Sequence, residues 1–231
     1  MTLSTPSSLP EVVAGTASRL ALRQQNLATL VPALLHDVNG SLNGLALSTE
    51  LLSRLQQRET TDAASAASLL LRTKNELSRL KIALKALENR VAPGGLSGQA
   101  PAREAPLVAT IEEVQAVLLP AIRRGQHEFR LAVDIAEIPV VSRPEDLFDL
   151  LAGLAIITIE GAPPRAAIFV AVDTSGVEAR VTIEHAGGAR AGMGIEMHRE
   201  LLRSATVHAG GAVEWQQSGA GSRALMRLLR A

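Results

Sequence analysis

One histidine stands beside a carboxylate and two Asn-Gly pairs in the stretch HDVNGSLNGL, residues 36–45. Neutral imidazole is a good nucleophile near pH 7, and it can accept a phosphoryl group if it is accessible and has a carboxylate nearby. Asp37 is that adjacent carboxylate. Asn-Gly is a turn signal, yet the apolar residues on either side keep a helical period. Gly40 and Gly44 each cost about 1 kcal/mol relative to Ala inside a helix, which indicates that bulk is avoided beside His36.

The surroundings of His36 on this helix are uncharged. At about 100° per residue the apolar stripe lies opposite the histidine. Between Arg23 and Arg54 the only charged residues are Asp37 and Glu50. Solvated helix faces usually carry Lys, Arg and Glu, so this strip favours close approach by another protein, although an ordinary solvent-facing histidine remains the alternative. The expected partner-binding face comprises Thr29, Pro32, Ala33, Asn39, Gly40, Asn43 and Leu47.

Composition excludes or disfavours several other functions. The chain has no cysteine, so disulfides, thiol catalysis and thiolate metal sites are excluded. The other four histidines form no HxxxH or HExxH pair, so we expect no metal site. The formal net charge is zero, which gives no reason to expect nucleic acid or an anionic membrane as partner. No apolar run is long enough to span a bilayer and no signal peptide is evident, so we expect a cytoplasmic protein.

Two helical segments must position His36. Apolar residues keep a helical period from about residue 16 to 58 and again from 61 to 91, after a flexible lead-in at residues 1–15. The short polar connection RETTD between them predicts an antiparallel hairpin, so residues 16–91 are expected to form one helical domain. Leucines and a valine spaced by seven residues predict a coiled-coil-like seam on the second helix: Leu70, Leu77, Leu84 and Val91, with Leu80 and Leu87 between them.

The pattern changes after APGGLSGQAPAREAP, residues 92–106, which is rich in Pro, Gly and Ala and reads as a linker. Residues 107–231 alternate between helical and strand patterns and predict an α+β domain. Helices are expected near residues 111–122, 144–159 and 192–208. Strands are expected at FRLAVDI, IPVV, AIFVAVD, ARVTIEH, AVEWQ and ALMRLLR.

The segment LLHDVNGSLNGLALSTELL resembles the phosphoacceptor H-box of two-component histidine kinases. In that motif His is followed by Glu or Asp and, a few residues later, by Pro-Leu-Asn. His36, Asp37, Leu42 and Asn43 match it, and Ser41 stands where proline is common. The resemblance implies that His36 accepts the phosphoryl group and that Asp37 orients or polarises it. It also implies that two hairpins form a dimeric four-helix bundle.

The second half is similar to the ATP-binding α/β sandwich of those kinases, with departures at the nucleotide contacts. LLAGLAIITIEGA lacks the Asn with which the family's nucleotide-binding helix holds magnesium and phosphates. Glu184 replaces the adenine-binding Asp, and Ala186 replaces the first glycine of the following turn. Only ARA separates this turn from Gly192, where the family has a longer lid. We interpret Gly192 and Gly194 as letting a helix begin close to a strand.

An H-box joined to a degraded ATP site resembles histidine phosphotransferases built on a kinase scaffold, the ChpT-like group. This resemblance implies a homodimer that relays phosphate between response-regulator receiver domains through His36. It implies no bound cofactor, because magnesium would come from the receiver. Two alternatives stay open: a divergent kinase that still uses ATP, and a non-catalytic dimeric scaffold that binds receivers.

Overall fold

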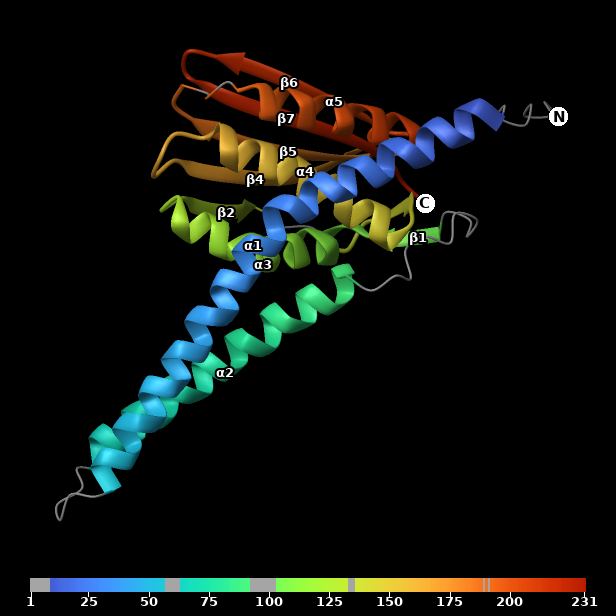
Figure 1. Ribbon diagram of the computed structural model, residues 1–231. Helices are drawn as coiled ribbons and strands as arrows, with labels where there is room; N and C mark the ends of the chain where they lie inside the picture. Colours follow the sequence, from blue (N-terminus) through green and yellow to red (C-terminus); the bar gives the residue numbers. More distant parts are fainter. Residues whose placement is uncertain (1–8, 57–62, 92–102, 133–135, 189, 191) are drawn as a thin grey trace. The chain divides into compact units, whose positions relative to one another are not determined.

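The computed structural model describes residues 9–56, 63–91, 103–132, 136–188, 190 and 192–231. Figure 1 shows the helices and strands that they form. The helices are α1 Leu9–Gln56, α2 Ala63–Val91, α3 Leu107–Arg124, α4 Pro144–Gly161 and α5 Met193–His208. The strands are β1 Arg103–Pro106, β2 Glu128–Ala132, β3 Pro139–Ser142, β4 Ala167–Ser175, β5 Glu178–Ala186, β6 Ala212–Ser218 and β7 Gly221–Leu229.

The expected fold class is confirmed: a helical hairpin of α1 and α2 precedes an α/β sandwich. The boundary between the two compact units differs from the expected one. One unit, here called the sandwich unit, joins the first part of the chain as far as Thr29 to the residues from Gly94 onward. The other, the hairpin unit, is Leu30–Pro93. The boundary therefore lies inside α1, and a domain starting at residue 16 does not describe the structure.

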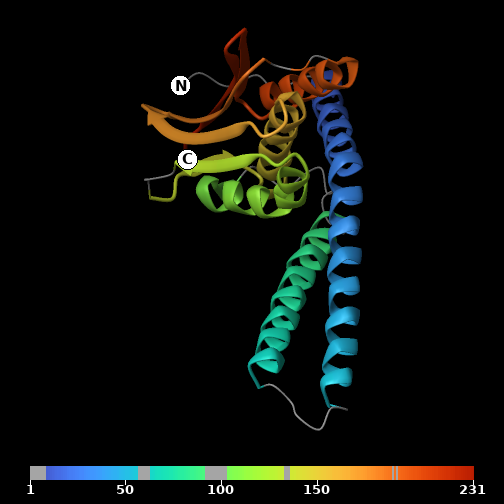
Figure 2. The same ribbon diagram turned by 90° about the vertical axis from the view of Figure 1, so that its left-hand side faces the viewer.

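The main sheet of the sandwich unit has five strands in the order β2-β4-β5-β7-β6. β2 runs parallel to β4, and the other neighbours are antiparallel. Side chains alternate between the two faces; on β4, Ile168, Val170 and Val172 are buried while Phe169 is exposed. This alternation arises because α3, α4 and α5 cover one face and leave the other open to solvent (Figure 2).

Helix α4 is enclosed more fully than a sandwich helix usually is. Every residue from Leu147 to Ile159 except Asp149 is buried. A helix that is apolar all round must be covered all round. The sheet, α3 and α5 cover part of its surface, and the first half of α1 lies along the rest (Figures 1 and 2). This first half is therefore part of the sandwich core.

Two further details differ from the sequence-based expectation. Helix α1 begins at Leu9, so only residues 1–8 of the expected lead-in precede it, and these lie outside the described residues. The last four residues of the expected linker form β1, which pairs antiparallel with β3; residues 92–102 lie outside the described part. Strand pairing fixes Arg103–Pro106 because β3 offers a partner that composition alone does not reveal.

Candidate functional site

His36 is an exposed residue in the middle of α1. The helix continues through both Asn-Gly pairs without a break, so their turn propensity is overridden. Each glycine costs only about 1 kcal/mol, and a helix of this length is stabilised mainly by packing of its apolar side. The imidazole is thus held on a regular helix rather than on a loop. Asp37, the next residue, is half-buried.

Most of the expected partner-binding residues lie on the surface. The exposed ones are Pro32, Asn39, Gly40, Asn43 and Leu47. Among the described residues, no atom lies within 4 Å of a Cβ added to Gly40, so the space beside the histidine is open. Leu47 is 48% exposed, which adds an apolar contact to an otherwise polar and uncharged patch.

Two of the expected partner-binding residues are placed differently. Ala33 is only 4% exposed, although neighbouring residues of this side of α1 are exposed. Thr29 belongs to the sandwich unit, where its hydroxyl hydrogen-bonds to Glu160. Burial raises the pKa of the Glu160 carboxyl, and the hydrogen bond from Thr29 opposes that shift. Neither side chain is therefore free to contact an incoming protein in the way that the helical pattern suggested.

The hairpin unit buries two serines and leaves several leucines exposed. On α1, Ser41 and Ser48 are buried at 4% and 1% exposure. The α2 side chains that are half-buried include Thr73 and Glu76. Large apolar side chains face outward instead: Leu35, Leu42, Leu70, Leu71, Leu77 and Leu84. Three leucines of the expected seam are thus solvent-facing in one chain, while the side chains of Leu87 and Val91 lie outside the described part.

Glu184 lies on the open face of the sheet. Its side chain is 50% exposed, and its Oε2 is 3.9 Å from Nε of Arg223. The neighbouring His185 points to the helix-covered face and is 4% exposed. The carboxylate therefore cannot take part in a site between the sheet and the helices. Side chains alternate between the two faces along β5, which places Glu184 and His185 on opposite faces.

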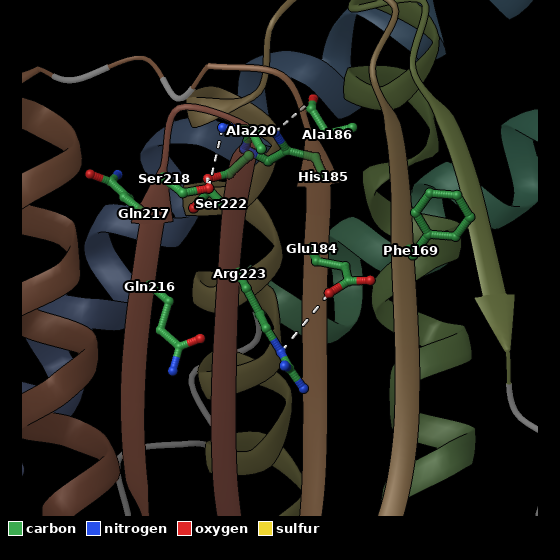
Figure 3. A pocket seen from close by; sticks show the side chains of 11 residues that line it. Phe169, Glu184, His185, Ala186, Gln216, Gln217, Ser218, Ala220, Ser222 and Arg223 are labelled. Carbon is green, nitrogen blue, oxygen red and sulfur yellow. Dashed lines mark hydrogen bonds and ion pairs between the residues drawn. The ribbon is translucent and has the colours of Figure 1, made fainter.

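A pocket of about 390 Å³ lies over this end of the open face (Figure 3). Phe169, Glu184, Arg223 and Gln216 form a row across four neighbouring strands. The charges here are matched within the protein, since Glu184 faces Arg223 in Figure 3. A cavity without excess positive charge does not suit a polyphosphate.

The glycines before and at the start of α5 do not have the expected role. Added Cβ atoms on Gly192 and Gly194 would meet nothing within 4 Å among the described residues. The interpretation that they permit close packing of helix and strand is therefore wrong. Gly187 is the residue with a structural need for glycine, because its φ is +92° and an added Cβ would come within 2.9 Å of Pro163. Its turn carries the chain from β5 toward α5.

Metal binding and membrane insertion are two other functions, and each requires particular features of the described residues. Nowhere in the described part of the chain do three or more His, Asp or Glu side chains gather as metal ligands. In the same residues, no helix combines the length and apolar character needed to cross a bilayer.

Comparisons with known proteins address the fold. The sequence matches no protein-family model and no curated protein. The catalytic domain of histidine kinase ThkA is similar in structure, with a TM-score of 0.51 and 16% identity, over 57% of this chain and 97% of that domain. ThkA in complex with the response regulator TrrA gives 0.48 and 17% over 90% of this chain and 64% of that chain. A bacterial phosphotransferase gives 0.46 and 14% over 97% of this chain and 100% of that one.

At these identities a likeness bears on fold alone, and of these three structures the ThkA catalytic domain is the one with a TM-score above 0.5. In this chain a long helix with an exposed histidine pairs with a second helix, and a sandwich with one open face follows them. The sandwich therefore has a fold like that of the histidine kinase catalytic domain, and a helical hairpin precedes it.

Proposed function

We propose that this protein is a homodimeric histidine phosphotransferase that relays a phosphoryl group between response-regulator receiver domains. The nitrogen of His36 attacks the phosphorus of an aspartyl phosphate on one receiver. A phosphorus–nitrogen bond forms as the phosphorus–oxygen bond to the aspartate breaks. The carboxylate of a second receiver then reverses this exchange and returns the free imidazole.

The observation that carries the proposal is the exposure of His36 within an open, uncharged patch. Phosphoryl transfer depends mainly on positioning and charge neutralisation, so a relay histidine needs little machinery of its own. Asp37 is the adjacent carboxylate that orients or polarises the imidazole. The docking face is formed by Pro32, Asn39, Gly40, Asn43 and Leu47. Magnesium, expected from the receiver, neutralises charge on the transferred group.

The sandwich supports a relay better than an ATP-dependent kinase. Helix α4 carries Ile, Leu, Ala and Gly where the resembling family has an Asn for magnesium and phosphates. Glu184 is directed away from the helices and toward Arg223. A nucleotide carries about four negative charges, and a site without a metal ligand or lysine cradle does not stabilise them. The donor of the phosphoryl group is therefore another protein.

A second copy of the chain is the expected cover for the outward-facing leucines. Leu42, Leu77 and Leu84 are 47%, 52% and 50% exposed, while Ser41 and Ser48 occupy buried positions. One hairpin thus buries small polar groups while about half of each of these leucines stays in water. Pairing two hairpins moves these leucines into a shared core at a gain of about 1.5–3 kcal/mol for each fully buried side chain.

Incubation with a panel of phosphorylated receiver domains tests the proposal. We expect label to pass from a receiver to the wild-type chain and onward to a second receiver. His36→Gln should abolish both steps, and His208→Gln, which changes another exposed histidine, should not. Transfer of label from ATP in the absence of a receiver would instead identify a kinase. Stable receiver binding without label on either variant would identify a scaffold.

A further inference from the structure

The first half of α1 fills the groove between α4 and α5. Leu22 and Asn26 are each 1% exposed. They meet both helices at Gly153 of α4: an added Cβ there would lie 3.1 Å from Leu22 Cδ1, 3.4 Å from Asn26 Oδ1 and 3.4 Å from Leu202 Cδ1. Glycine at this position therefore lets three helices approach one another closely. Any larger side chain would push α1 away.

Asn26 bridges the two walls of the groove. Its Nδ2 donates a hydrogen bond to the backbone carbonyl of Asp149 at 2.8 Å, and its Oδ1 lies 2.9 Å from Nε2 of His198. Because the amide nitrogen is the donor, Oδ1 must accept, so His198 carries its proton on Nε2. His198 is 1% exposed, and its Nδ1 has no hydrogen-bond partner among the described residues. A buried polar pair of this kind fixes one registration of the helices.

Further contacts between α1 and the two helices lie along the groove on the N-terminal side of Leu22. Arg19 forms an ion pair with Asp146 at 2.9 Å, and the hydroxyls of Ser18 and Ser204 are 2.8 Å apart. Gly15 lies against the ring of His208, because an added Cβ would come within 2.5 Å of its Cδ2. The segment from Gly15 to Thr29 therefore occupies the groove along about four helical turns.

This groove adjoins the helix that the sequence resemblance matches to the nucleotide-binding helix of the kinases. In that family a lid lies between the sheet and the helix that follows. Here the shortened connection is held down on α4, since the backbone nitrogen of Arg190 donates to the carbonyl of Gly161 at 2.8 Å. Residues of α1 cover another part of α4, at Asp146, Asp149 and Gly153.

We propose that residues 15–29 occupy the α4/α5 groove permanently, so that the groove stays closed to any ligand. These residues also stay docked in the groove throughout phosphotransfer. The statement about phosphotransfer rests on the proposed function, and the statement about the closed groove does not. The alternative is a strap that must leave the groove in each cycle, as a mobile catalytic domain would require. The two differ in whether a covalent link across the groove is tolerated.

The double variant Ser18→Cys/Ser204→Cys provides that link. The chain has no other cysteine, and a 2.8 Å hydroxyl separation suits a disulfide. We expect the disulfide to form under mild oxidation and phosphotransfer to stay within about two-fold of the reduced form. A loss of about ten-fold or more on oxidation, restored by reductant, would overturn the proposal. Failure of the disulfide to form would also overturn it, because the groove would then be open in solution.

Hydrogen exchange of the wild-type chain gives a readout that needs no receiver. Amides of residues 15–29 should be protected as strongly as those of α4 and should open together with them. Free exchange of α1 beside a protected α4 would contradict a permanent occupant. If the phosphotransfer assay fails but this protection is found, the relay is wrong and the closed groove stands. The single variants Ser18→Cys and Ser204→Cys control for the substitutions themselves.

Discussion

The side chain of Glu76 on α2 lies against Gly44 on α1. A Cβ added to Gly44 would come within 3.3 Å of Glu76 Cγ, whereas one added to Gly40 would meet nothing. The two glycines of the Asn-Gly pairs therefore have different roles. Gly44 makes room for α2 inside the hairpin, and only Gly40 keeps the space beside His36 open. The sequence suggested one shared role for both.

Alanine at these two positions should separate the roles. Gly40→Ala removes the entropic cost of glycine without a steric clash, so the free energy of unfolding should rise by up to about 1 kcal/mol. Gly44→Ala should gain less, because Glu76 must move by a few tenths of an ångström. Urea denaturation of both variants measures the difference. Equal gains would show that Glu76 does not constrain Gly44.

A bulky residue at Gly40 should block docking without unfolding the helix. Gly40→Leu places an aliphatic side chain beside the imidazole, and we expect phosphotransfer from receivers to fall by about ten-fold or more. Ser53→Leu, at an exposed position further along α1, is the matched control and should transfer normally. Circular dichroism should be unchanged in both. Normal transfer by Gly40→Leu would remove Gly40 from the docking face.

Removing the amide of Asn26 should weaken the sandwich unit. Asn26→Ala leaves Nε2 of His198 buried without its partner and removes one hydrogen bond to the carbonyl of Asp149, at a cost of about 1–3 kcal/mol. The exposed neighbour Gln24 offers a control, since Gln24→Ala should change stability by less than about 0.5 kcal/mol. Thermal and chemical denaturation measure both. A loss below about 1 kcal/mol in Asn26→Ala would mean that water replaces the amide.

Stability should fall in mild acid because of His198. Burial lowers the pKa of His198 to about 4. The unfolded chain therefore binds a proton at higher pH than the folded chain, so unfolding takes up protons as the pH falls from about 6.5 to 4. The stability present above pH 6.5 should drop by about 3 kcal/mol over that window. His198→Gln should flatten the profile of unfolding free energy against pH, and an unchanged slope in that variant would assign it to other groups.

Charge on the outward leucine face should dissociate the dimer. Leu77→Glu places a carboxylate in the expected shared core, and sedimentation should then report a monomer at concentrations where the wild type is dimeric. The next residue, Ser78, is also exposed, and Ser78→Glu should leave the association state unchanged. A wild-type chain that is monomeric at high concentration would refute the shared core directly.

The strands of the sandwich were accessible from sequence because their alternation is strong. AIFVAVD and ARVTIEH lie within β4 and β5, and alternate residues are buried against the helices. The hairpin was equally accessible, since two long helical periods flank a short polar connection. In both cases the periodicity of neighbouring residues carries the information.

The roles of individual side chains depended on contacts that periodicity does not contain. Asn26 looks like an ordinary polar residue on a helix, yet it is 1% exposed because α4 and α5 close over it. Ala33 shares the side of α1 that carries His36, yet it is buried. Glu184 was matched to a motif position, and the motif does not show that its side chain lies on the open face and near Arg223. Contacts between residues far apart in the sequence decide where each of these side chains lies.

The groove segment of α1 also sets an order of assembly. Its hydrogen-bond partners lie 123, 172 and 186 residues further along the chain. The ribosome therefore releases this segment first and its binding surface near the end, with the whole hairpin made in between. The hairpin is thus an insertion within the sandwich, and closing the sandwich requires contacts between residues far apart in sequence, which form slowly. Substitutions that weaken the contacts of residues 15–29 should consequently cause misfolding of the part of the sandwich that follows the hairpin.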